Sequence, residues 1–269
     1  MAESHISVKN LVKKYGDLAA VDDISFEVPA GSIFAFLGPN GAGKTTTIKM
    51  LTTLVHPTSG SIAVNGFDPM KDANSVRHSF GIVFQDPSLD DELTAYENMF
   101  LHAGLYGVPR SETAGRIKEL LTFVELWDRK DSLCKTFSGG MKRRLEIARG
   151  LLHTPTILFL DEPTVGLDPQ TRNHIWSYLK KLNEERGLTI FFTTHYMDEV
   201  ERTATHVAVI DHGKMVANDT AEGIKRQAGS ETLEDAFIKL TGHGMREEEA
   251  GTVDQLRNMA KVWGRGSRR

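Results

Sequence analysis

Residues 33–47 read Ile33-Phe34-Ala35-Phe36-Leu37-Gly38-Pro39-Asn40-Gly41-Ala42-Gly43-Lys44-Thr45-Thr46-Thr47, an apolar strand followed by a glycine-rich turn and a helix start. From Gly38 to Thr45 they match the pattern G-x-x-x-x-G-K-[ST], whose glycines let backbone N–H groups surround an anion at a helix N-terminus. The Lys44 ammonium can reach terminal phosphates, and the Thr45 hydroxyl can ligate an accompanying magnesium ion. The pattern therefore predicts a phosphate-binding loop.

A helix is expected directly after this loop, over residues 46–54. Its apolar residues Ile48, Leu51 and Leu54 have the spacing that buries one face, and its dipole would direct a positive end at the phosphates. A dinucleotide-binding loop is the weaker interpretation, because Thr46 occupies the place of the third glycine in G-x-G-x-x-G. We discard it.

The composition is that of an ordinary globular protein: 269 residues, 40% hydrophobic and 25% charged, enough for one large or two small domains. The formal net charge of -4 gives no general basic character, so nucleic acid is not expected as a partner. The single cysteine, Cys134, excludes an intrachain disulfide. No apolar run approaches the ~20 residues that span a bilayer, and the first residues lack the build of a secretory signal. We expect a cytoplasmic protein.

Three further apolar strands are expected over residues 80–85, 156–161 and 188–195, and polar side chains stand at the end of each. Open α/β sheets bind ligands at the carboxyl ends of their strands. Asp161 can therefore serve a magnesium ion and Glu162 a water molecule. His195 and Gln85 stand at equivalent strand ends, which favours a functional histidine over a surface one.

The other elements are predicted from periodicity. Residues 5–37 favour short β segments, 93–124 a helical insert, 170–185 and 232–240 helices, and 207–210 a last strand. A further helix over 142–149 is expected to bury Leu145, Ala148 and Leu152 and to present a basic outer face.

Two motifs have two interpretations each at this level. Ser138-Gly139-Gly140 precedes a helix and forms a second anion-binding shape, although a serine at an N-cap needs no ligand. Tyr15 lies in a polar turn region, where it could offer its ring to a nucleobase or serve as an ordinary packing or surface tyrosine.

Together these motifs resemble the ATP-binding cassette of ABC transporters, over roughly Ile6–Gly229. The loop, Gln85, Ser138-Gly139-Gly140, Asp161-Glu162, Gly166-Leu167-Asp168 and His195 occur in the order of that family. The resemblance implies an α/β fold: a P-loop NTPase core with an N-terminal antiparallel β subdomain and an inserted α-helical subdomain at about 87–153. It assigns residues 1–229 to the nucleotide-binding domain and 230–269 to an extension with a helix and a basic tail, which contains Lys261, Arg265, Arg268 and Arg269.

The resemblance also implies ATP and Mg²⁺ as cofactors and a role for each motif. Glu162 would be the catalytic base, assisted by His195, Lys44 and Gln85, and the metal would be held by Thr45, Gln85 and Asp161. The residues expected to contact ATP are Tyr15, which would stack on adenine, Gly38, Pro39, Asn40, Gly41, Ala42, Gly43, Lys44, Thr45 and Thr46. From the opposite chain of a dimer, Ser138, Gly139, Gly140 and Asp168 would complete the site.

The wider segments 138–146 and 233–237 are similar to the daunorubicin-resistance type of drug and polymer exporters, although Met141 stands where many members have glutamine. This likeness implies an ATPase subunit that pairs with a second copy or a homologous chain. It would power a multi-span membrane permease from the inner face of the cell membrane, exporting drugs, lipids or polymers.

The alternative is a soluble ABC-type ATPase or a nucleotide-dependent regulatory module without a membrane partner. A DNA-repair ATPase would need a long coiled-coil insert, and a translation factor usually carries two cassettes. A module without turnover would be expected to lose Glu162 or His195.

Overall fold

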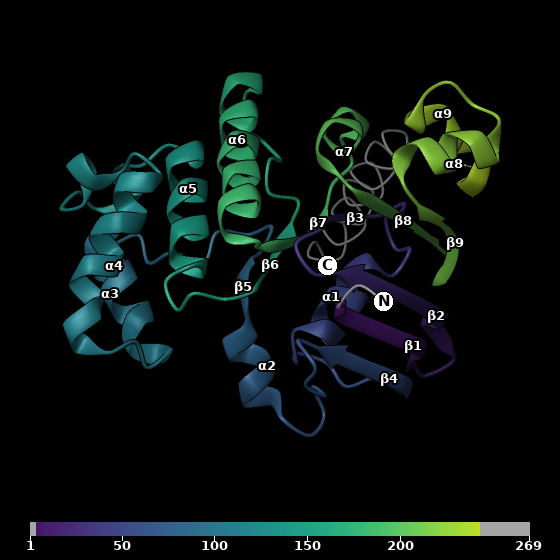
Figure 1. Cartoon of the computed structure of the whole chain (residues 1–269), viewed down its shortest axis with the longest axis horizontal. Helices are drawn as coiled ribbons and strands as arrows, with labels where there is room; N and C mark the ends of the chain where they lie inside the picture. The colour runs from purple at the N-terminus through teal and green to yellow at the C-terminus, as the bar shows by residue number, and fades with distance from the viewer. Residues whose placement is uncertain (1–3, 243–269) are drawn as a thin grey trace, which may run out of the picture.

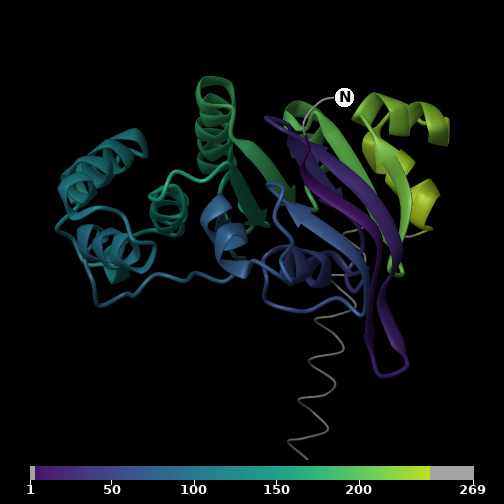
Figure 2. The same ribbon diagram turned by 60° about the horizontal axis from the view of Figure 1, so that its bottom comes forward.

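The computed structural model describes residues 4–242 and begins with a three-stranded antiparallel sheet. Its strands lie in the order β2 (Leu18–Pro29), β1 (Ser4–Tyr15) and β4 (Ser59–Val64). β1 pairs in the antiparallel sense with both neighbours, which confirms the expected N-terminal antiparallel unit. β1 and β2 have 12 residues each and are longer than predicted, because their pairing continues past several irregularities in register. In Figure 2 their hairpin projects beyond the rest of this sheet.

A six-stranded sheet forms the centre of the molecule (Figure 1). Its order is β5 (Phe80–Val83), β6 (Ile157–Asp161), β7 (Thr189–Thr193), β3 (Ile33–Leu37), β8 (His206–Asp211) and β9 (Lys214–Asp219). All neighbours are parallel except β8 and β9. Every residue of β3, β6 and β7 is buried, as expected for parallel strands covered on both faces.

Alternate residues of these strands enter two different cores. On the face toward the antiparallel sheet, Phe34, Phe159 and Phe191 pack with Phe26 of β2; the Phe34 and Phe191 rings stack at 5.5 Å. The helices α1 (Lys44–Leu51) and α2 (Ala73–Ser79) pack into this same core. The core on the opposite face includes residues of α6 (Pro169–Arg186), α7 (Met197–Thr203), α8 (Ala221–Ala228) and α9 (Leu233–Thr241).

A group of helices lies on the side of the molecule away from the antiparallel sheet (Figure 1). It comprises α3 (Ala95–Leu105), α4 (Arg110–Phe123), the short 3-10 turns η1 (Trp127–Arg129) and η2 (Cys134–Thr136), and α5 (Gly139–Gly150). The helical insert predicted over 93–124 is two helices, because Gly107 takes a left-handed φ of 65° and Pro109 caps α4. These elements place an α-helical unit between β5 and β6.

Two details of the predictions were wrong. The helix after the loop ends at Leu51 rather than at residue 54, since Thr53 has a left-handed φ of 64°, and Leu54 is 57% exposed instead of buried. Leu145 and Ala148 of α5 are buried as expected, as is Leu152 just beyond the end of the helix, but the outer face of α5 is not uniformly basic because the Arg143 side chain is buried. The predicted basic tail lies outside the described residues.

Candidate nucleotide-binding site

The glycine-rich turn joins β3 to α1 in a conformation that requires its glycines. Gly43 has a φ of 109°, and a Cβ there would lie 2.5 Å from the Ala20 carbonyl oxygen. A Cβ on Gly38 would lie 2.3 Å from the Ile210 carbonyl oxygen. Any side chain at these two positions would push the loop away from β2 and β8.

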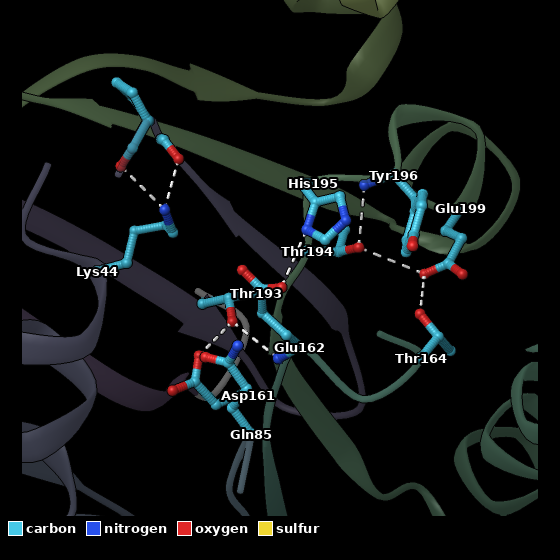
Figure 3. A network of polar contacts seen from close by, with 12 residues as sticks. Lys44, Gln85, Asp161, Glu162, Thr164, Thr193, Thr194, His195, Tyr196 and Glu199 are labelled. Atoms are coloured by element: carbon cyan, nitrogen blue, oxygen red, sulfur yellow. Dashed lines mark hydrogen bonds and ion pairs between the residues drawn. The ribbon is translucent and has the colours of Figure 1, made fainter. Parts of the chain in front are cut away.

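Lys44 begins α1 and is buried, and its ammonium lies under the loop. Its Nζ donates to the carbonyl oxygens of Gly38, at 2.5 Å, and Pro39, at 3.0 Å (Figure 3). Thr45 and Thr46 follow in the first helical turn and are less buried than Lys44. The N–H groups of the first turn and the positive dipole end of α1 thus lie beside a cation, an arrangement suited to phosphate.

The loop opens into a pocket of about 180 Å³. It is lined by Ala20, Asn40, Gly41, Gly43, Lys44, Thr45, Thr46, Gln85, Asp161 and Glu162. The structure therefore brings six of the expected loop residues together with Gln85 and both carboxylates, whereas Gly38, Pro39 and Ala42 do not line the pocket. Hydroxyl, amide and carboxylate oxygens converge here, and they are the ligands that magnesium prefers, so the side chains of Thr45, Gln85 and Asp161 fit such an ion.

The two carboxylates at the end of β6 differ in environment. Asp161 is buried, and burial raises the pKa of its carboxyl, while a hydrogen bond from Thr193 Oγ1 at 2.6 Å acts to lower it. Glu162 has a left-handed φ of 50°, and its N–H donates to Thr193 Oγ1 at 3.1 Å. His195 Nδ1 lies 2.9 Å from Glu162 Oε2 (Figure 3). Glu162 is thus held by both β7 and the loop that follows it.

Gln85 reaches the pocket from the segment after β5. Its main-chain carbonyl accepts from Arg143 Nη2 at 3.1 Å, so this segment is tied to α5. Tyr15 is absent from the pocket lining: it ends β1, is 49% exposed, and lies 4.9 Å beneath the Lys13 ammonium. The predicted adenine contact of Tyr15 stays a prediction.

The Ser138-Gly139-Gly140 motif lies outside the pocket, at the start of α5. The Ser138 hydroxyl accepts from Met141 N at 3.3 Å. Asp168 caps the neighbouring helix α6, accepting from Thr171 N at 3.0 Å and Thr171 Oγ1 at 2.6 Å. A Cβ on Gly140 would lie 2.5 Å from Thr171 Cγ2, so the two helix starts are in close contact. The expected partner-facing residues therefore form one surface, separate from the phosphate loop of their own chain.

Sequence reasoning missed several supporting residues. Thr193 holds Asp161, and the buried Glu199 accepts from Thr164 at 2.9 Å and from Thr194 at 3.4 Å (Figure 3). Glu199 thereby joins the segment after Glu162 to the segment before His195. The parallel pairing of β6 and β7 places Thr193 opposite Asp161, and the sequence alone does not give this register.

Fold and site define a P-loop nucleoside triphosphatase: a phosphate loop follows the central strand β3 of a largely parallel sheet, and two carboxylates lie at the end of β6, which is separated from β3 by β7. A family model described as "ABC transporter" matches residues 21–165. The chain belongs to the ABC transporter family and is its ATP-binding, ATP-hydrolysing component.

Relatives in the family carry names from export and resistance. The chain is 42% identical to the linearmycin resistance ATP-binding protein LnrL of Bacillus subtilis, over 96% of this chain and 81% of LnrL. It is 43% identical to the daunorubicin/doxorubicin resistance ATP-binding protein DrrA of Streptomyces peucetius, over 85% and 69%. The Nod factor export ATP-binding protein I of Burkholderia lata is 40% identical, over 87% and 77%.

Solved structures of ABC ATPases have the same fold. An ATP-binding subunit of an ABC transporter superposes with a TM-score of 0.80 at 31% identity, covering 88% of this chain and 99% of that one. The ATP-binding cassette MJ0796, a dimer in a post-hydrolysis state with ADP and phosphate, superposes with a TM-score of 0.72 at 28% identity, covering 80% and 98%. Among residues 4–242, no helix combines the length and apolarity needed to cross a membrane.

Proposed function

We propose that this chain is the ATPase subunit of a membrane exporter, and that two copies, or one copy and a homologous chain, close around two ATP molecules. The observation that carries the proposal is the separation of two anion-binding motifs within one chain. The phosphate pocket contains Lys44 and Glu162, whereas Ser138 lies elsewhere, beside Asp168 at the starts of α5 and α6. A second chain that supplied its Ser138 surface would complete the pocket.

Hydrolysis would use the side chains that the pocket gathers. Glu162 would accept a proton from the attacking water, and its contact with His195 would orient the carboxylate. The His195 imidazole would help to hold the terminal phosphate. Lys44 balances phosphate charge, and Asp161, Thr45 and Gln85 would hold Mg²⁺. The metal supplies positive charge to the phosphate oxygens when bound. Most of the catalytic effect comes from positioning and charge, because phosphoryl transfer asks little covalent chemistry of the protein.

The membrane partner would dock on the helical unit. Three large apolar side chains of α3, Phe100, Leu101 and Leu105, are 54%, 57% and 74% exposed on neighbouring turns. An exposed apolar patch of this kind marks an interaction surface. We propose that a multi-span permease contacts it at the inner face of the membrane. We also propose that the nucleotide-binding domain comprises residues 1–229, with a helical unit at about 87–153. Residues 230–269 would form an extension.

Relatives named for linearmycin resistance, daunorubicin resistance and Nod factor export support an exporter. The three cargoes differ, and each name belongs to a chain other than this one. The proposal is therefore confined to export of a drug, lipid or polymer by the whole complex.

The decisive experiment mixes two inactive variants, Lys44→Ala and Ser138→Arg. Each homodimer should be inactive, since one lacks the phosphate charge in both sites and the other has a bulky side chain in both. A mixed dimer contains one whole site, made by the phosphate loop of the Ser138→Arg chain and the Ser138 surface of the Lys44→Ala chain. Random exchange makes about half of the dimers mixed, so turnover should recover to roughly a quarter of the wild-type value, or less if the sites depend on each other.

Differently tagged subunits confirm that chains exchange, and ATP hydrolysis is measured before and after mixing. Normal hydrolysis by the unmixed Ser138→Arg protein would show that Ser138 is not part of the site. In that case the shared-site mechanism would be wrong for this chain.

A further inference from the structure

Arg143 and Glu146 form a buried ion pair on α5. Arg143 Nη1 lies 3.2 Å from Glu146 Oε2, and the two side chains are 8% and 2% exposed. Taking two charges out of water is costly, and an apolar pair of similar size would often stabilise the fold as well or better. Stabilisation of α5 therefore does not explain this ion pair. The other contacts of Arg143 and Glu146 indicate a different role.

Those contacts go to one segment, residues 84–88, which carries Gln85. Arg143 Nη1 donates to the Phe84 carbonyl oxygen at 2.6 Å, and Nη2 donates to the Gln85 carbonyl oxygen at 3.1 Å. Glu146 Oε1 accepts from Ser88 N at 2.7 Å. The planar guanidinium fork spans two successive carbonyls, which the single ammonium of a lysine cannot do. The segment is thus held to α5 on both sides of Gln85.

The same helix carries the other anion-binding motif. Ser138 caps α5 five residues before Arg143, which is about 7.5 Å along a helix at ~1.5 Å per residue. One rigid element of less than two turns therefore connects the Ser138 surface with the main chain of Gln85. In the proposed dimer these two groups serve different ATP molecules, since Gln85 faces the phosphate loop of its own chain and Ser138 faces that of the partner.

We infer that Arg143 and Glu146 are a positioning pair that fixes Gln85 to α5. When the Ser138 surface moves onto the partner's nucleotide, Gln85 therefore moves with it into the site of its own chain. The inference rests on the proposed function. Neither side chain lines the phosphate pocket, so both act through Gln85 and Ser138. The pair would link the two ATP sites of the dimer.

The first test is a double-mutant cycle on ATP turnover. The pair variant is Arg143→Met/Glu146→Gln, in which no buried carboxylate loses its partner and the glutamine carbonyl can still accept from Ser88 N. It should lower kcat by ~10- to 100-fold, the scale for misplacing a catalytic group, with KM for ATP little changed. In a Gln85→Ala background the same change should cost several-fold less than in the wild-type background, because the part of the loss that acts through the Gln85 side chain is gone while the part that acts through Ser138 remains.

The matched control is Lys142→Ala on the same helix. The Lys142 side chain forms a partly exposed ion pair with Asp91, at 2.6 Å, and makes no hydrogen bond or ion pair with residues 84–88. Lys142→Ala should leave kcat unchanged, both in the wild-type background and in the Gln85→Ala background. Thermal unfolding of every variant confirms that the chain is folded. Additive losses for the pair variant, or normal kcat for Gln85→Ala, would overturn the inference.

The second test places the pair variant in one chain of the mixed dimers described above. The single whole site takes Gln85 from the Ser138→Arg chain and Ser138 from the Lys44→Ala chain. If the pair positions Gln85 alone, turnover should fall only when the pair variant is in the Ser138→Arg chain. If the pair positions Ser138 alone, turnover should fall only when the pair variant is in the Lys44→Ala chain. The inference predicts a loss of at least about tenfold in both placements.

A loss in one placement only would overturn the link between sites. Failure of the proposed function gives a different result, because wild-type chains would then not hydrolyse ATP and unmodified mixed dimers would show no recovery. If wild-type turnover is normal and unmodified mixed dimers recover activity, a loss in a single placement rejects this inference and leaves the proposed function intact.

Discussion

Replacing Thr193 by valine removes one hydroxyl from beneath the two carboxylates and changes the side-chain shape little. That hydroxyl donates to Asp161 Oδ1 at 2.6 Å and accepts from Glu162 N at 3.1 Å. Glu162 N keeps a second acceptor, the Thr193 carbonyl oxygen at 3.2 Å, so the main loss falls on Asp161. A hydrogen bond to a charged group contributes about 1.5–3 kcal/mol, which corresponds to a factor of roughly ten to a hundred or slightly more.

We expect this loss to appear in the magnesium dependence of hydrolysis. Burial raises the pKa of Asp161 and the Thr193 hydrogen bond lowers it, so the valine variant raises that pKa further. Less of the carboxylate is then ionised, and the ion must compete with a proton. The magnesium concentration for half-maximal turnover should rise about tenfold at neutral pH and by more at mildly acidic pH.

The assay is the initial rate of ATP hydrolysis against magnesium concentration at both pH values. Thr52→Val is the control, since Thr52 is also buried and, among residues 4–242, its hydroxyl bonds only to the Ile48 carbonyl oxygen, at 2.8 Å, at the far end of α1. An unchanged magnesium curve for Thr193→Val at both pH values would refute the idea that Thr193 supports Asp161.

The remaining predictions concern the base, the helix start and pH. Glu162→Gln should keep ATP binding but slow turnover by about 10²–10⁴-fold, so that ATP-bound dimers accumulate in size-exclusion chromatography; wild-type hydrolysis would remove Glu162 from its role. Met141→Gln should change hydrolysis only a few-fold, because the hydroxyl and N–H groups at the start of α5 would bind the phosphate; a hundredfold change would contradict this. Burial lowers the pKa values of His102 and His153 to about 4. The unfolded chain therefore binds protons that the folded chain excludes, and thermal stability should fall as pH drops from about 6.5 to about 4. His102→Phe should flatten this dependence of thermal stability on pH; an unaltered slope would show that His102 does not contribute to it.

The fold and the centre of the site were predictable because their signals are local. A glycine-rich turn between an apolar strand and a helix start is a contiguous pattern, and it predicted the loop around Lys44. The carboxylates and His195 follow apolar runs directly, and parallel strands bring such ends to one edge of a sheet. The meeting of the two carboxylates at the pocket, with His195 in contact with Glu162, follows from those two facts.

The supporting contacts were not predictable because they depend on distant main-chain groups. Arg143 stands in a run of basic residues that looks solvated, but its acceptors are carbonyls of residues 84 and 85, which periodicity cannot locate. Thr193 lies in a buried strand, where the sequence indicates burial but not the neighbour. Leu54 extended a good helical pattern, and the left-handed turn at Thr53 interrupted it.

The strand order also bears on how the protein is made. In the described part of the chain, β3 pairs only with β7 and β8, which are completed at residue 211. A ribosome adding about 5–20 residues per second would need roughly ten to thirty-five seconds between synthesis of Leu37 and of Asp211. Until Thr193 is added the strand before the phosphate loop has neither of these sheet neighbours, and until β8 is made Gly38 lacks the Ile210 backbone against which it packs. Nascent chains should therefore gain nucleotide affinity late in translation, after β8 has left the exit tunnel.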